Sequence, residues 1–165
     1  MMNALARVAR IRLDETGSMA IETAFVAPVL LVMALGGFEA SSIVARQTEL
    51  QSAAAEAAAV VRAVAPETAA ERRTVRNIVA TSICGKSTPV FTDGAATCGS
   101  VRVDVDPIYR CGTTDDYVTS AGSCGSGTEY KFIKIDITDT YSPIWAEWGV
   151  GSAVDYDVNR TVQIG

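Results

Sequence analysis

The chain has 165 residues and a formal net charge of −5, and it contains no histidine. An acidic chain without basic patches in its C-terminal part lacks the electrostatic footprint of a nucleic-acid-binding protein. The missing histidine removes the commonest general base and metal ligand, so we expect neither an enzyme nor a resident metal or other cofactor.

A short basic leader precedes a long apolar run. Residues 1–17 carry three arginines, and residues 23–38 carry no charge at all. The apolar character continues to residue 45, so a helix here is long enough to cross the roughly 30 Å hydrocarbon core of a membrane. Because the arginines precede the span, we expect a cytoplasmic leader (1–17), a transmembrane helix (18–45) and an exported domain (46–165).

Two residues of the apolar run stand out. Glu22 is a lone carboxylate at the edge of the span, where a charge is costly and usually has a partner. The alternative is a glutamate that snorkels to the membrane surface without one. Pro28 lies inside the span and leaves the carbonyl of Ala24 without its helix hydrogen bond, which predicts a kink.

The alanine-rich residues 46–65 continue the helix, because no turn signal interrupts them. One apolar stripe is predicted to face the core: Ile43, Leu50, Ala54, Ala57, Val61 and Val64. Pro66 ends this helix or opens a second one over 67–82. In that second helix Val75, Ile78 and Val79 are expected inward and Glu71, Arg72, Arg73 and Arg76 outward, as a solvated face rather than a binding patch.

After Cys84 the apolar period changes from helical to alternating. Strands are predicted at 101–106, at 130–137 running on toward Tyr141, and at 154–164. The expected fold is α+β, with a long N-terminal helix, a second short helix and a small antiparallel sheet.

The four cysteines, Cys84, Cys98, Cys111 and Cys124, lie in the C-terminal half among glycine, serine, threonine and aspartate. An even number behind an export-type N-terminus indicates two disulfides in an oxidising compartment. Three connectivities are open, and we favour the local pairs Cys84–Cys98 and Cys111–Cys124, each closing a surface loop. A Cys₄ metal site is the alternative, but the C-x₂-C spacing is missing.

The run Gly17-Ser18-Met19-Ala20-Ile21-Glu22-Thr23-Ala24-Phe25-Val26-Ala27-Pro28 resembles the opening of TadE-like minor pilins and pseudopilins of the tight-adherence (Flp-type IV) pilus system. Residues 139–144, followed by a strand bearing Arg160, are similar to the family's C-terminal part, although this match is weaker. The resemblance implies that a prepilin peptidase cuts between Gly17 and Ser18, leaving Glu22 as the fifth residue. Thr23 departs from the tyrosine that is common at this position.

The resemblance also implies partners. These are the prepilin peptidase, other pilin and pseudopilin subunits, the inner membrane and the Tad secretion platform, with a role in pilus assembly or surface adhesion. Pairing Glu22 with the new α-amino group of Ser18 on a neighbouring subunit would neutralise both charges and set the axial register.

Three alternatives remain open. An ordinary signal peptide could end before Glu56 and release a secreted, disulfide-stapled binding module. An uncleaved single-span anchor shares the same topology. The aspartate pairs Asp104 and Asp106, or Asp115 and Asp116, could serve an enzyme or bind calcium, but they lack a nucleophile motif or regular oxygen spacing.

Overall fold

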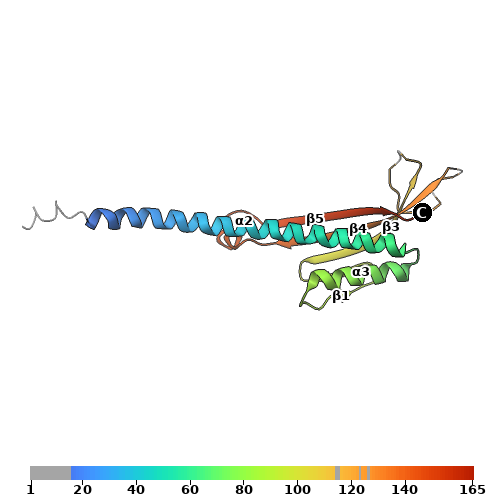
Figure 1. The fold of residues 1–165 in the computed structure, drawn as a ribbon, viewed down its shortest axis with the longest axis horizontal. Coiled ribbons are helices and arrows are strands. Elements are labelled where there is room, and N and C mark those ends of the chain that lie inside the picture. The colour runs from blue at the N-terminus through green and yellow to red at the C-terminus, as the bar shows by residue number, and fades with distance from the viewer. Residues whose placement is uncertain (1–15, 114–115, 123, 126) are drawn as a thin grey trace, which may run out of the picture. The chain divides into compact units, whose positions relative to one another are not determined.

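The structure is a computed structural model of the chain and describes residues 16–113, 116–122, 124–125 and 127–165. Most of the leader, up to residue 15, therefore lies outside the described residues. The chain divides into two compact units, Met1–Ser42 and Ile43–Gly165. Each unit is described by itself, and the elements are labelled in Figure 1.

Helix α2 (Thr16–Val64) contains both predicted helical segments without a break. It ends at the expected place: Ala65 adopts a positive φ of 46° and donates its N–H to the Val61 carbonyl at 2.8 Å. Pro66 follows, and a proline disfavours helical geometry in the residue before it.

In the second unit α2 buries the predicted stripe, because Leu50, Ala54, Ala57 and Val61 are at most 1 % exposed. Val64 is exposed, so its predicted inward position is wrong. It is the last residue of the helix, and the chain turns away directly after it.

Helix α3 (Ala69–Cys84) starts two residues later than predicted because Thr68 caps it. The Thr68 hydroxyl accepts the Glu71 N–H at 3.2 Å, and the Glu71 carboxylate accepts the Thr68 N–H at 2.9 Å. This reciprocal capping box satisfies two backbone donors that the helix itself leaves free. Pro66 is therefore not the first residue of the helix.

The inward face of α3 was predicted only in part. Val75 and Val79 are buried as expected, but Ile78 is exposed and Arg76 is buried, so both of those assignments are wrong. The buried face also includes Ala80 and Ile83, which turns Ile78 away from the core. Arg76 is accommodated because its guanidinium donates to the Asp93 carbonyl at 3.3 Å and to its neighbour's side-chain amide.

The sheet is an antiparallel meander whose five strands follow chain order. They are β1 (Val90–Phe91), β2 (Ala96–Cys98), β3 (Val101–Cys111), β4 (Glu129–Tyr141) and β5 (Val154–Gln163), with a 3₁₀ helix η1 (Ile144–Trp148) before β5. The three long strands were predicted, whereas β1 and β2 were not, because two or three residues are too short to show an alternating pattern.

The part of α2 that belongs to the second unit runs beside α3 (Figure 1), and both contribute side chains to the core on one face of the sheet. One row of the core joins Val103, Ile137 and Val158 across three strands, and all three are buried. The next row, Asp104, Asp136 and Asn159, points to the other face. The α+β prediction is confirmed.

Both disulfides have the predicted local connectivity. Cys84–Cys98 joins the end of α3 to β2, and Cys111–Cys124 closes the loop after β3. Because all four cysteines are bonded in pairs, the alternative of a Cys₄ metal site is not realised.

Candidate functional site

The N-terminal part of α2 carries the residues that the sequence singled out. Gly17 and Ser18 lie in the first turn of the helix, which starts at Thr16. Glu22 follows one turn later and is exposed. Thr23 is also exposed, but its hydroxyl donates to the Met19 carbonyl at 2.8 Å, so the helix satisfies this polar group itself.

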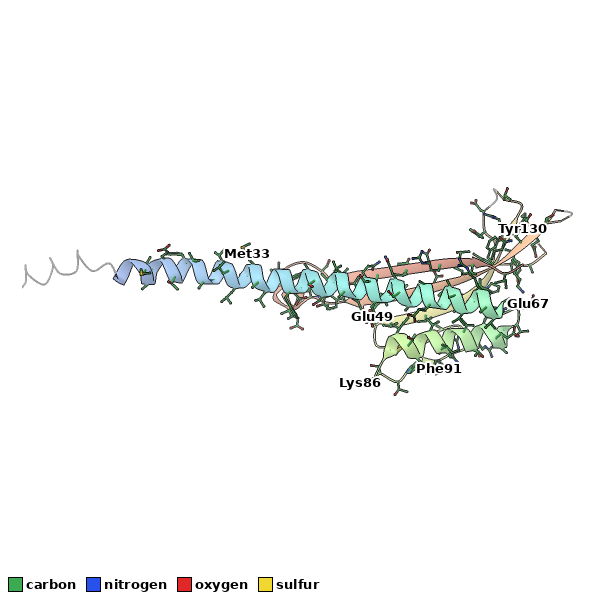
Figure 2. All side chains as sticks on the ribbon, viewed as in Figure 1. Met33, Glu49, Glu67, Lys86, Phe91 and Tyr130 are labelled. Atoms are coloured by element: carbon green, nitrogen blue, oxygen red, sulfur yellow. A yellow bond between two sulfur atoms is a disulfide. The ribbon has the colours of Figure 1, made fainter. Side chains whose placement is uncertain are left out.

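Beyond Glu22 the helix presents large apolar side chains that no described residue of the same unit covers. Phe25 is 74 % exposed and Val32 is 70 % exposed, and Figure 2 shows side chains such as Met33 projecting from the bare helix. A contiguous exposed apolar surface of this kind marks a membrane or a protein interface. Among the described residues, one helix is long and apolar enough to cross a membrane, with a mean hydropathy of 2.0 over its best window.

A segment that crosses a membrane would be shorter than the candidate span. The candidate span runs over Met19–Val64, which is 46 residues. A membrane core takes only about 20 residues of helix. The core of the second unit buries Leu50, Ala54, Ala57 and Val61. Only the exposed part of the helix N-terminal to these residues is therefore available to lipid.

Pro28 lies inside α2, and the helix continues through it. A proline at this position has no N–H to donate to Ala24, so that carbonyl lacks its usual partner. The predicted kink stays a prediction.

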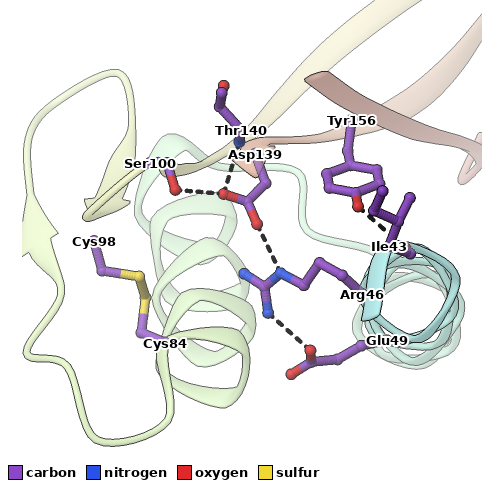
Figure 3. Close-up of polar contacts among 9 residues, drawn as sticks. All are labelled: Ile43, Arg46, Glu49, Cys84, Cys98, Ser100, Asp139, Thr140 and Tyr156. Carbon is purple, nitrogen blue, oxygen red and sulfur yellow. Dashed lines mark hydrogen bonds and ion pairs between the residues drawn. A yellow bond between two sulfur atoms is a disulfide. The ribbon is translucent and has the colours of Figure 1, made fainter. Parts of the chain in front are cut away.

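In the second unit a partly buried ion pair joins α2 to the sheet, as Figure 3 shows. Asp139 of β4 is 5 % exposed, and one carboxylate oxygen accepts the Arg46 Nε at 2.7 Å. Its other oxygen accepts the Ser100 hydroxyl at 2.6 Å and the Thr140 N–H at 2.8 Å. Arg46 also contacts Glu49 at 2.8 Å. These three donors satisfy the hydrogen-bonding capacity of a carboxylate that is shielded from water.

A second polar contact lies next to this pair. The Tyr156 hydroxyl on β5 donates to the Ile43 carbonyl of α2 at 3.1 Å. Burial raises the pKa of Tyr156, and the nearby Asp139 carboxylate raises that pKa further. The phenol therefore stays protonated and remains a donor.

The sequence did not predict this contact, because Arg46 is not part of the apolar stripe expected to face the core. One signal was available. Asp139 continues the alternation of Ile133, Ile135 and Ile137, so its side chain had to point into the core. A carboxylate at a core position needs a cation or several donors. The position of its partner, 93 residues away in sequence, had no local signal.

Comparison with known proteins bears on α2. Residues 17–59 match the family model described as TadE-like protein. These residues are a TadE-like segment. The match starts at Gly17 and lies entirely within helix α2. No curated protein and no solved structure matches the chain.

The TadE-like segment confirms the resemblance that was based on the run from Gly17 to Pro28. It also includes Glu22 and Arg46, so the acidic residue of the apolar helix and the cation of the partly buried ion pair belong to the same matched segment. The weaker resemblance at residues 139–144 lies outside the match and remains a prediction.

The aspartates considered for catalysis or calcium lie away from the TadE-like segment. Asp104 contacts Arg102 at 2.7 Å on the outer face of the sheet. Partial burial raises the pKa of Asp106, and the carboxylates of Asp104 and Asp136 raise that pKa further. Asp115 lies outside the described residues. Within the described ranges, no group of three or more histidine, cysteine, aspartate or glutamate side chains could hold a metal ion.

Proposed function

We propose that this protein is a minor pilin or pseudopilin of a Tad-type pilus. It is anchored in the inner membrane with its N-terminus in the cytoplasm, trimmed by a prepilin peptidase, and assembled through its N-terminal helix with other pilin subunits and the Tad secretion platform. The observation that supports this most directly is a TadE-like match that starts at Gly17, on a helix whose large apolar side chains are exposed among the described residues of their unit.

The proposed cut lies between Gly17 and Ser18, inside the first turn of α2. Because the ends of helices fray readily, unwinding this turn to present an extended substrate costs little. The glycine weakens helical structure there by about 1 kcal/mol relative to alanine.

The mature N-terminus tests this step. Mass spectrometry of the protein from its native cell should find Ser18 first, and Gly17→Ala should leave the leader attached. Gly36→Ala is a matched control, because a Cβ at Gly36 would meet open space and the site is remote from the cut. A chain that starts at Met1 or Met2 would identify an uncleaved anchor and contradict the proposed trimming.

A chain that starts near Glu56 would identify an ordinary signal peptide. The fold argues against that alternative. A cut there would remove Leu50 and Ala54, both 0 % exposed, from the core of the second unit. Removing one large core side chain costs about 2–5 kcal/mol.

Glu22 is assigned to assembly rather than to insertion. In an apolar bundle an unpaired carboxylate is costly, and the α-amino group of Ser18 on a neighbouring subunit would neutralise it. Glu22→Ala should still be exported and trimmed, but its incorporation into pili should fall by about a hundredfold, as expected for breaking a buried ion pair. Glu22→Asp, which keeps the charge, should still be incorporated into pili in part. Normal pili from the Glu22→Ala strain would rule out the register role.

The role we propose is structural, in pilus assembly or surface adhesion, and not catalytic. The outer-face aspartates are then solubilising groups of the exported domain.

A further inference from the structure

Strand β5 (Val154–Gln163) is an edge of the sheet along its whole length, because only β4 pairs with it. In an antiparallel pair, alternate residues direct their N–H and C=O toward the partner strand. Ile164, directly after β5, donates to the Lys131 carbonyl at 3.0 Å. Even-numbered residues of β5 therefore bond to β4, and the odd-numbered ones direct their backbone groups to the open side.

The open side presents the backbone groups of four consecutive odd positions: Asp155, Asp157, Asn159 and Thr161. Within the described part of the chain no hydrogen bond reaches their N–H or C=O groups from that side. The side chains at these positions are exposed. Edge strands without proline or cover are templates for pairing with another chain.

A groove runs beside this edge. It has a volume of about 240 Å³ and is lined by Gln47 and Gln51 of α2 together with residues 157–160 of β5. The edge therefore has room next to it and polar side chains along it, and no described segment of the same unit fills the space.

We propose that the β5 edge binds an extended segment of another exported protein by strand addition, and that this segment carries lysine or arginine at alternate positions. On the outer face the added strand would lie next to Asp155 and Asp157, which carry the charge complementarity, because Asp136 one strand further in is already paired with Lys134 at 2.7 Å. Main-chain hydrogen bonds supply affinity in this binding mode, and alternate side chains supply specificity. The proposal concerns the second unit alone and is independent of N-terminal trimming.

The probe is a synthetic peptide of about nine residues in which valine and lysine alternate. It is titrated into the full-length protein in detergent micelles, with a glutamate-for-lysine peptide as the charge control. The lysine peptide should bind at least tenfold more tightly than the glutamate peptide, and amide exchange should slow at Asp157, Asn159 and Thr161. Equal binding of the two peptides, or unchanged exchange at these amides, would overturn the proposal.

Two matched substitutions test the backbone directly. Asn159→Pro removes an N–H that faces the open side, which an edge strand tolerates, and should weaken binding by at least about tenfold. Asn159→Ala keeps the N–H and should bind like the wild type. If a folded Asn159→Pro protein binds the peptide as tightly as the wild type, strand addition is contradicted.

If Asn159→Pro disturbs the fold, peptides that are N-methylated on alternate residues make the same test without changing the protein. One methylation register should abolish binding and the other should not, since a strand at an edge bonds through only one of its sides. Equal binding in both registers contradicts the proposal.

Discussion

Asp139 is the residue through which strand β4 holds helix α2. Its carboxylate is 5 % exposed and has donors from Arg46, Ser100 and Thr140. Without this carboxylate the Ser100 hydroxyl and the Thr140 N–H lose their acceptor, and Arg46 keeps only the exposed Glu49 as a partner. Asp139→Ala should therefore lower the free energy of unfolding by about 3 kcal/mol, measured by denaturant titration of the full chain in micelles.

Glu49 supplies the control for this substitution. It contacts the same Arg46 at 2.8 Å, but its side chain is 56 % exposed. Exposed ion pairs contribute about 0–1 kcal/mol, so Glu49→Ala should change stability little. Equal losses from the two substitutions would show that the contact between α2 and the sheet does not depend on Asp139.

Glu71 makes the cap of α3 dependent on pH. Hydrogen bonds from the Thr68 N–H and hydroxyl lower the pKa of Glu71 below its ordinary value. A carboxylate whose pKa falls on folding contributes stability above its unfolded pKa, and this contribution is lost as pH falls through the folded pKa. Glu71→Gln should thus reduce stability at neutral pH, and the difference from the wild type should shrink on acidification. A difference in melting temperature that is independent of pH would exclude the carboxylate as its source.

At the scale of elements, the two disulfides make comparable contributions. They join cysteines 14 and 13 residues apart, and loops of this length correspond to about 3 kcal/mol in the loop-entropy model. Replacing Cys84 and Cys98 together by serine should lower the free energy of unfolding by about that amount. Thermal unfolding with and without a reducing thiol measures this, and the reduced wild type should be less stable than the double variant. A double variant as stable as the wild type would show that the Cys84–Cys98 disulfide does not stabilise the fold.

The elements that the sequence predicted are those whose pattern is local. The three long strands each contain a run in which apolar and polar residues alternate, and α2 carries a helical apolar stripe. The exposed Ile78 and the buried Arg76 were assigned to the wrong faces, because the side of a short helix that meets the core depends on its tertiary neighbours. The cap at Thr68 was readable, since Glu71 stands three residues after it.

The residues of the candidate site likewise include some that the sequence could predict and some that it could not. Gly17, Glu22 and Pro28 form a sequence pattern, and the family match covers all three. The Arg46–Asp139 pair joins residues 93 positions apart, and the open edge of β5 depends on strand order. Features of this kind follow from the three-dimensional arrangement and have no local sequence signal.

For the whole molecule, the second unit contains a complete core. Residues buried in its cluster come from α2, α3 and four of the strands, and both disulfides lie within it. A fragment comprising Ile43–Gly165 should therefore fold without detergent and unfold in one cooperative transition. Near-ultraviolet circular dichroism of the oxidised fragment measures this. An aggregated or unstructured fragment would show that the apolar N-terminal residues are needed for folding.

If the domain is exported as proposed, the strand order sets the order in which its hairpins can form. Every strand pairs with the one directly before it, so a chain that emerges N-terminus first can close each hairpin on residues that have already arrived. The contacts from Asp139 to Arg46 and from Tyr156 to Ile43 span 93 and 113 residues, so they form only near the end of delivery. Until β5 emerges, β4 has an unpaired side. Before the last residues arrive, the unpaired side of β4 is therefore exposed to mispairing with another strand or to binding by a chaperone.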